Sequence, residues 1–207
     1  YGAVISGLDS RVTIDPEALD IDGLYRFPVG VRNTGNDRDS YYVTAIIGRG
    51  DWTTIANNQA RVMWGMGLRP GDLIFIGAVF SLYVGSWGAL IGAERLRAQC
   101  FPFGAGATGM TARAALWMRM TKPKAFYGTP SYALHLAEVA LGDGIDPKEF
   151  ELDLLFFSGE PGASIPSVRN RIVDLYDARV IDCGSMAEMT PWMNAAGTKE
   201  TDGMLLW

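Results

Sequence analysis

Residues 125–162, AFYGTPSYALHLAEVALGDGIDPKEFELDLLFFSGEPG, are the stretch of sequence that decides the fold. This stretch predicts a strand at residues 125–127, a helix at residues 131–141 and an almost entirely apolar strand at residues 152–158. A helix of this length between two strands is typical of parallel strands joined by a crossover helix.

The same alternation continues on both sides of this stretch. We expect further strands at residues 41–47, 73–80, 99–103 and 179–182, and further helices at residues 51–66, 83–97, 111–120 and 164–176. Asp51 is the expected N-cap of the first helix. The predicted fold class is therefore α/β, a mostly parallel sheet with crossover helices. Neither an internal repeat nor a low-complexity linker interrupts the chain, so residues 1–207 are expected to form a single domain.

The composition is that of a globular protein, with 48% hydrophobic and 20% charged residues in a chain of 207. A net charge of −5 and the lack of a run of basic residues argue against electrostatic binding to nucleic acid. Two distant cysteines, Cys100 and Cys183, exclude a disulfide scaffold or zinc ribbon and favour a reducing, cytoplasmic location. The single histidine, His135, leaves little for a His-centred triad or metal site, and we expect it to be a packed or partly exposed helix residue.

An uncharged run at residues 73–93 is long enough to span a bilayer. Several glycines and serines interrupt the run, so a buried strand followed by a helix is favoured over a membrane span. Charged residues follow the short apolar N-terminus at once and no basic leader precedes it, so no signal peptide is expected. The six tryptophans are expected in the core, with Trp87, near a glycine-rich turn, as the candidate exception.

Ligands of a parallel sheet bind beyond the carboxyl ends of its strands. One loop at this edge, GAGATG at residues 104–109, matches the dinucleotide pattern GxGxxG and leaves an NAD-dependent oxidoreductase as one alternative. However, no acidic residue stands between Glu94 and Glu138 to bind a ribose hydroxyl. A flexible glycine turn is the favoured interpretation, and its backbone allows a ligand to approach closely.

Two further loops at this edge carry carboxylates. Glu160, held between Gly159 and Pro161, indicates either a ligand contact or a tight turn with a solvated side chain. Asp182 and Glu188 follow the next strand, and paired carboxylates there suit Mg²⁺ and the phosphates of a nucleotide. Cys183 between them is expected to be a small buried residue, because no histidine is near it in sequence.

Four segments together resemble the phenylacetate–CoA ligase family of adenylate-forming (AMP-binding) enzymes. They are GLRPGDLIF (residues 67–75), GALIGAERLRAQCFPFGAG (residues 88–106), FYGTPSYALHLAEVA (residues 126–140) and FSGEPG (residues 157–162). Their order and spacing resemble the family from about residue 67 to residue 207. The resemblance implies an AMP-forming acyl–CoA ligase that uses ATP, Mg²⁺ and coenzyme A and activates an aromatic or arylacetic acid through an acyl-adenylate.

The resemblance also implies the site residues. The residues implied to bind the nucleotide are Gly159, Glu160, Pro161, Asp182, Cys183, Gly184, Ser185, Met186 and Ala187. Glu188 is implied as the catalytic residue and Mg²⁺ ligand. The chain departs from the family at Gly184, where an adenine-stacking aromatic is usual, at Ser185, where a glycine is usual, and at Ala187, where a hydroxyl residue is usual.

The acid is expected to lie at the same edge of the sheet. Topology and resemblance together place its apolar part against Phe80, Tyr83, Trp87, Gly104, Gly106, Tyr127 and Gly128. The expected partners are a small-molecule carboxylic acid, ATP and coenzyme A, without nucleic acid or membrane, and a homodimer stays open.

The sequence has no clear match to two parts of such ligases, the phosphate-binding loop and the C-terminal domain. Only NTGND at residues 33–37 stands where the family has its phosphate-binding loop, either because the loop has degenerated or because residues are missing there, and we favour the second. The smaller C-terminal domain with its lysine has no counterpart, and TDGMLLW at residues 201–207 resembles a strand from the middle of such enzymes. We therefore expect an incomplete N-terminal AMP-binding domain that is inactive in isolation. The alternative is a non-catalytic nucleotide- or acyl-binding relative.

Overall fold

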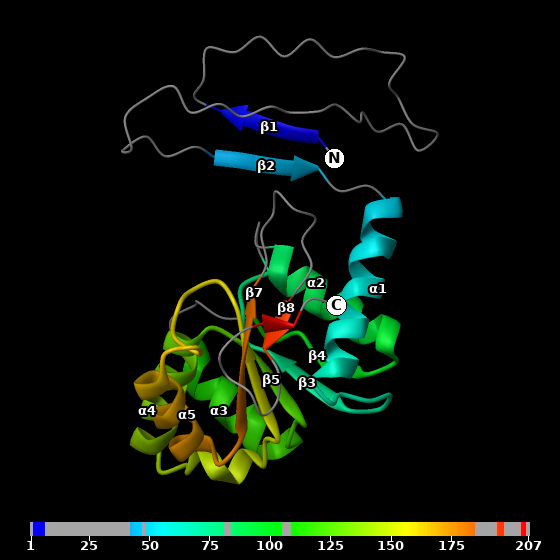
Figure 1. Ribbon diagram of the computed structural model, residues 1–207. Helices are drawn as coiled ribbons and strands as arrows, with labels where there is room; N and C mark the ends of the chain where they lie inside the picture. Colours follow the sequence, from blue (N-terminus) through cyan, green and yellow to red (C-terminus); the bar gives the residue numbers. More distant parts are fainter. Residues whose placement is uncertain are drawn as a thin grey trace, which may run out of the picture. The chain divides into compact units, whose positions relative to one another are not determined.

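The computed structural model describes residues 2–6, 42–46, 49–80, 84–104, 109–184, 194–196 and 204–205. The chain divides into two compact units, Tyr1–Thr54 and Ile55–Trp207 (Figure 1). The prediction of a single domain stays a prediction.

The first unit contains a two-stranded antiparallel sheet. β1 (Gly2–Ser6) pairs with β2 (Tyr42–Ile46), so that Gly2 lies opposite Ile46. The strand predicted at residues 41–47 is confirmed, whereas β1 was not predicted. Helix α1 (Arg49–Gly65) begins in this unit, before Asp51. Asp51 is therefore not the N-cap but lies within the first turn of the helix.

The second unit is built on a seven-stranded sheet in the order β4-β3-β5-β6-β7-β8-β9. Its strands are β3 (Leu73–Ile76), β4 (Gln99–Phe101), β5 (Ala125–Gly128), β6 (Leu154–Phe157), β7 (Arg179–Gly184), β8 (Asn194–Ala196) and β9 (Met204–Leu205). The first five in sheet order are parallel, and β8 and β9 are antiparallel. The predicted α/β fold class is confirmed.

Helices cover both faces of the parallel strands (Figure 1). The helices that follow α1 are α2 (Val84–Leu96), α3 (Met110–Thr121), α4 (Pro130–Gly142) and α5 (Pro166–Tyr176), with a short 3₁₀ helix, η2 (Pro147–Phe150), before β6. Buried residues of α1 and α2 share one hydrophobic cluster with Ile74 and Phe156. Buried residues of α3, α4 and α5 form the other cluster with Phe75 and Phe157.

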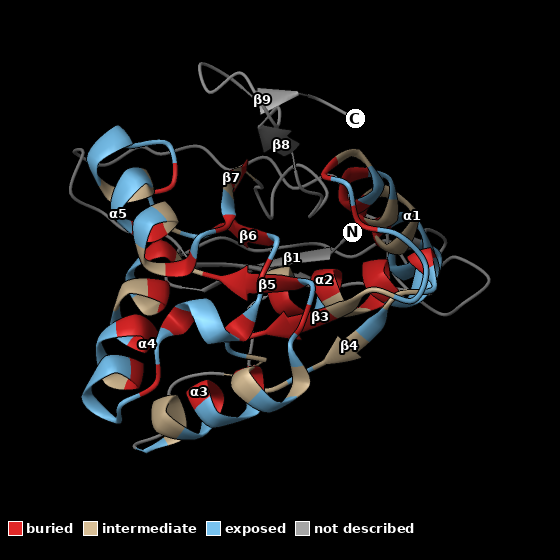
Figure 2. Cartoon of the chain, turned by 90° about the horizontal axis from the view of Figure 1, so that it is seen from below, coloured by how far each residue is buried: buried red, intermediate tan, exposed pale blue. Residues whose placement is uncertain are grey.

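The apolar strands of the sequence are explained by this two-sided burial. Along β6, Leu154 and Phe156 face one helix layer, and Leu155 and Phe157 face the other. All four side chains are at most 1% exposed, and Figure 2 shows the central strands as buried. Parallel strands covered on both faces are expected to be continuously apolar rather than alternating.

The run that could have spanned a bilayer divides into β3 and α2, as the strand-then-helix interpretation predicts. β3 ends at Ile76, before Gly77, where a Cβ atom would lie 2.6 Å from the Phe126 ring. Among the described residues, no helix has both the length and the apolarity needed to cross a membrane.

The prediction that the tryptophans lie in the core is wrong for Trp52, Trp64 and Trp117, whereas Trp87 was the candidate exception and is indeed exposed. The exposed fractions are 37% for Trp52, 52% for Trp64, 39% for Trp87 and 42% for Trp117. Each lies on a helix, where the face turned away from the sheet meets solvent. Trp192 and Trp207 lie outside the described residues.

Candidate functional site

The order of the strands in the sheet reverses between β3 and β5. The chain runs from β3 to β4 on one side and then to β5 on the other, so the order of the strands reverses at this point. In doubly wound sheets, ligands bind outside the carboxyl ends of the strands at such a reversal. The segments that leave these ends carry Phe80 after β3 and Gly128 at the end of β5.

The turn after β6 packs against the first residues of α4. Ser158 donates its backbone N–H to the carbonyl oxygen of Gly128 at 3.2 Å. Gly159 has a φ of +93°, and a Cβ atom on Gly162 would lie 2.8 Å from Cβ of Pro130. The two glycines of SGEPG are therefore explained by backbone conformation at Gly159 and by close approach at Gly162.

Glu160 has a partner that the sequence did not reveal. One carboxylate oxygen accepts the backbone N–H of Ser131 at 2.6 Å, at the N-terminus of α4. Thr129, the N-cap of the same helix, accepts the N–H of Tyr132 at 3.3 Å. Helix N-termini favour both oxygen acceptors and negative charge. Glu160 therefore connects the β6 turn to α4, and its predicted place beside adenine stays a prediction.

Tyr127 and Ser158 form a buried pair at the ends of neighbouring strands. The two hydroxyl oxygens are 2.7 Å apart, and the exposed fractions are 0% for Tyr127 and 2% for Ser158. The Tyr127 ring also contacts Phe156, with 5.0 Å between ring centroids. Tyr127 is thus a core residue whose hydroxyl bonds to the residue that follows β6, and its predicted contact with the acid is not tested.

Three of the predicted acid-binding residues come together near the carboxyl ends of β3 and β4. Phe80 and Trp87 meet edge to face, with 5.1 Å between ring centroids. Gly104 donates its N–H to the carbonyl oxygen of Ile76 at 3.0 Å, and a Cβ atom there would lie 3.9 Å from Phe80. Tyr83 and Gly106, predicted for the same pocket, lie outside the described residues.

The loop after β7 is described only at its start. Asp182 is half-buried, and Gly184 pairs with Asn194 of β8. Cys183 is buried, as predicted, and its Sγ lies 3.9 Å from Sδ of Met66. Burial, and to a smaller extent the charge of Asp182, raises the pKa of the Cys183 thiol, so the thiol stays protonated and unreactive.

The remaining predicted residues of this loop, Ser185, Met186, Ala187 and Glu188, lie outside the described residues. In the described part of the chain, no group of three or more His, Cys, Asp or Glu side chains could hold a metal ion. The magnesium site assigned to Glu188 therefore stays a prediction.

Two lysines are held at the other edge of the sheet. Lys122 pairs with Glu151, and Lys124 pairs with Asp153, in the segments that precede β5 and β6. The amino ends of parallel strands lie opposite the ligand edge. Neither Lys122 nor Lys124 therefore lies at the candidate site.

Relatives of the chain are acid–coenzyme A ligases. A phenylacetate–coenzyme A ligase of Pseudomonas putida is 31% identical over 76% of this chain and 35% of that protein. One of Escherichia coli is 30% identical over 73% of this chain and 34% of that protein. The chain is a relative of the phenylacetate–coenzyme A ligases. It spans about a third of the length of these curated relatives.

Solved structures of ligases agree with this relationship. A 2-hydroxyisobutyryl–CoA ligase in complex with 2-HIB-AMP and CoA is 62% identical, with a TM-score of 0.77, over 81% of this chain and 36% of that one. An anthranilate CoA ligase in complex with anthranoyl-AMP, 20% identical with a TM-score of 0.54, shares the fold over 72% of this chain and 28% of that one. No family model matches the chain.

Proposed function

We propose that the protein containing this chain is an AMP-forming acid–coenzyme A ligase. The observation that carries the proposal is 62% identity to a ligase solved with an acyl-adenylate and coenzyme A. In the proposed reaction, a carboxylate oxygen of the acid bonds to the α-phosphorus of ATP and pyrophosphate leaves. The thiol sulfur of coenzyme A then bonds to the acyl carbon, AMP leaves and the thiol proton passes to solvent.

The nucleotide is proposed to lie beside the turn that contains Gly159, Glu160 and Pro161. The bond from Ser131 to Glu160 and the close approach of Gly162 to Pro130 support a rigid backbone border for adenine. A rigid border would hold the bound nucleotide in one orientation. Less orientational entropy is then lost when the carboxylate reaches the α-phosphorus, which lowers the barrier. The other residues proposed to border the nucleotide are Asp182, Cys183, Gly184, Ser185, Met186 and Ala187.

Asp182 and Glu188 are the residues proposed to face Mg²⁺ and the phosphates, with Glu188 as the ligand. Carboxylate oxygens are hard donors of the type that Mg²⁺ prefers, so this donor set fits the metal. The Asp182 side chain is half-buried at the carboxyl edge and not sealed in the core. When bound, magnesium would neutralise phosphate charge as pyrophosphate leaves.

The acid is proposed to be a small 2-hydroxy carboxylic acid. This choice rests on the 62% identity to a 2-hydroxyisobutyryl–CoA ligase, compared with 31% to a phenylacetate–coenzyme A ligase. An aromatic or arylacetic acid is the second candidate, favoured by the exposed rim of Trp87 beside Phe80.

Thioester formation tests the function and the acid together. The protein is incubated with ATP, Mg²⁺, coenzyme A and either 2-hydroxyisobutyrate or phenylacetate, and AMP and the CoA thioester are quantified by mass spectrometry. Formation of the thioester of 2-hydroxyisobutyrate supports both the ligase function and the proposed acid. Formation of the phenylacetate thioester alone supports the ligase function with an aromatic acid as the substrate. Binding of nucleotide without any AMP formation would favour a non-catalytic relative.

A further inference from the structure

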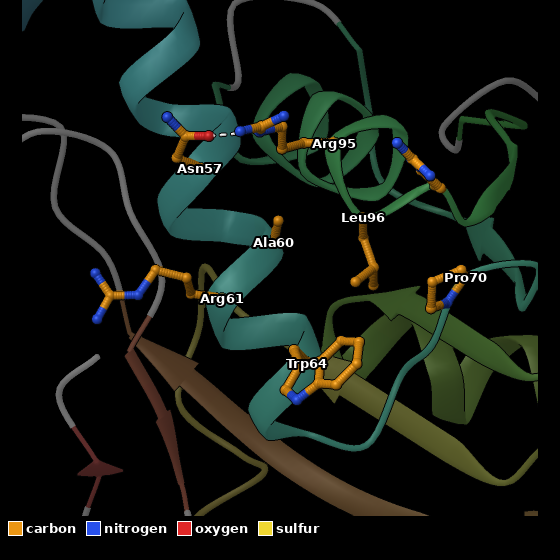
Figure 3. Close-up of a pocket in the computed structure, with 8 residues that line it drawn as sticks. Asn57, Ala60, Arg61, Trp64, Pro70, Arg95 and Leu96 are labelled. Carbon is orange, nitrogen blue, oxygen red and sulfur yellow. Dashed lines mark hydrogen bonds between the residues drawn. The ribbon is translucent and has the colours of Figure 1, made fainter.

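A groove lies between α1 and the end of α2, apart from the candidate site. It has a volume of about 870 Å³ and is lined by Asn57, Ala60, Arg61, Trp64, Pro70, Arg95, Leu96 and Arg97. Figure 3 shows Leu96 pointing into the groove, Trp64 and Pro70 at one end, Arg95 toward the other, and Arg61 extending from the far flank of α1. The volume lies in the range of small-molecule sites.

The groove lies at the edge of the sheet opposite the candidate site. Pro70 stands shortly before β3, and Arg97 stands between α2 and β4, so both mark the amino ends of parallel strands. The turn after β6 and the loop after β7 mark the carboxyl ends. A ligand of the groove would therefore be distinct from the nucleotide and acid of the proposed reaction.

The charged residues that line the groove are all basic, although the chain has a net charge of −5. Its lining includes three arginines and no acidic residue. Arg95 donates from Nε to Oδ1 of Asn57 at 2.5 Å, which fixes its guanidinium and leaves the terminal N–H groups for a ligand. Within the described residues, neither Arg95 nor Arg97 forms an ion pair. Guanidinium groups suit phosphate and carboxylate, which they can bind through paired hydrogen bonds.

One end of the groove is a fixed aromatic wall. The Trp64 side chain is 52% exposed, and the guanidinium of Arg69 lies 4.0 Å from its ring centroid. Arg69 is itself held because Nη1 donates to the carbonyl oxygens of Trp64 and Leu68, each at 2.8 Å. A cation over an indole ring stabilises the pair, so Trp64 is held in place, and Pro70 lines the same groove.

We propose that this groove binds a phosphate ester with a planar aromatic body, such as an aryl phosphate or a nucleotide. The phosphate would lie at Arg95 and Arg97, and the aromatic part would lie against Trp64 and Pro70. An arginine in the last turn of a helix also complements the helix dipole, so Arg95 alone would not indicate a ligand. The second arginine, the aromatic wall and the volume together carry the assignment, which does not depend on ligase activity.

The test uses 1-naphthyl phosphate as the probe and isothermal titration calorimetry of the 207-residue chain. We expect one binding event per chain, weakened at least about tenfold in Arg97→Asn, because a charge-assisted hydrogen bond is lost. Asparagine is chosen because Arg97 has a φ of +63°, which asparagine tolerates. Trp64→Leu should weaken binding by about fivefold or more. Arg113→Gln, an exposed arginine of α3 outside the groove, is the matched control and should bind as the unaltered chain does.

Melting curves of each variant establish that the fold is retained. Unchanged affinity in both Arg97→Asn and Trp64→Leu would overturn the proposal, and so would an equal loss in Arg113→Gln. Inorganic phosphate should bind at least about tenfold more weakly than the ester. Equal affinity for inorganic phosphate and for the ester would show that Trp64 does not contribute to binding, and would overturn the assigned ligand class.

Discussion

The carboxylate of Glu160 accepts the backbone N–H of Ser131 at 2.6 Å, which connects the turn after β6 to the first turn of α4. The two residues lie at the carboxyl edge of neighbouring strands, where the nucleotide is proposed to bind. Thr129 is the N-cap of α4 and Pro130 is its first residue, so Ser131 lies in the first turn of the helix. The turn after β6 therefore supplies a hydrogen-bond acceptor to the N-terminus of α4.

Removing the Glu160 carboxylate should lower the stability of the chain. Glu160→Ala loses an acceptor at a helix N-terminus and is expected to cost about 1 kcal/mol, or a few degrees in Tm. Glu160→Gln keeps an oxygen acceptor and should cost less. Glu138→Ala, at an exposed position later in the same helix, is the control and should change Tm by less than half as much. Equal Tm values for Glu160→Ala and Glu138→Ala would show that the bond contributes nothing.

A side chain on Gly162 should be costly. A Cβ atom there would lie 2.8 Å from Cβ of Pro130, so Gly162→Ala must displace the turn or α4, at about 1–3 kcal/mol. Gly142→Ala is the matched control, since no atom lies within 4 Å of the added Cβ and no positive φ is required. That variant should be neutral or stabilising by up to about 1 kcal/mol. Urea denaturation of both variants measures the difference, and similar midpoints would contradict the close contact.

The hydroxyl pair of Tyr127 and Ser158 should be energetically coupled. Tyr127→Phe and Ser158→Ala each remove one partner of a buried hydrogen bond, and each is expected to destabilise by about 0.5–1.5 kcal/mol. The double variant should be less destabilised than the sum, by about 1 kcal/mol. A double-mutant cycle in urea measures this coupling energy. Strict additivity would mean that the two hydroxyls do not depend on each other.

The two thiols should make the fold less stable at alkaline pH. Burial, followed by the charge of Glu94, raises the pKa of Cys100 to about 12, and the pKa of Cys183 is also raised. The unfolded chain therefore loses these protons at a lower pH than the folded chain, so stability is retained below about pH 9 and falls as pH rises above it. Urea midpoints at pH 8 and pH 10 should differ more for the unaltered chain than for Cys100→Ala/Cys183→Ala. An identical pH dependence would contradict the assigned pKa directions.

Much of the second unit was predictable from sequence because its elements have strong local signals. The strands β5 and β6 are apolar along their length, and Pro130 and Pro166 mark the starts of α4 and α5. The predicted ends of the strands were less accurate. The apolar run predicts that β3 continues to residue 80, but the strand ends at Ile76, before Gly77. The pairing of β1 with β2 joins segments remote in sequence, and nothing local specifies it.

The candidate site was predictable as a set of loops but not as a set of contacts. The position of Glu160 after an apolar strand indicated its edge of the sheet, yet its bond to Ser131 depends on how α4 packs. The groove was missed for a similar reason. Arg95 and Arg97 resemble solvated residues at a helix end, and Trp64 resembles a core residue. Only the packing of α1 beside α2 brings these side chains together.

The most direct test of the proposed ligase function is acid-dependent exchange of labelled pyrophosphate into ATP. Residues 55–207 replace the corresponding segment of the solved 2-hydroxyisobutyryl–CoA ligase, which supplies the remaining parts of a whole enzyme. We expect exchange with 2-hydroxyisobutyrate, loss of at least about a hundredfold in Glu188→Gln at unchanged Tm, and no exchange by the 207-residue chain alone. A folded chimera that binds ATP but exchanges no pyrophosphate with any acid, or equal exchange by its Glu188→Gln variant, would contradict the account.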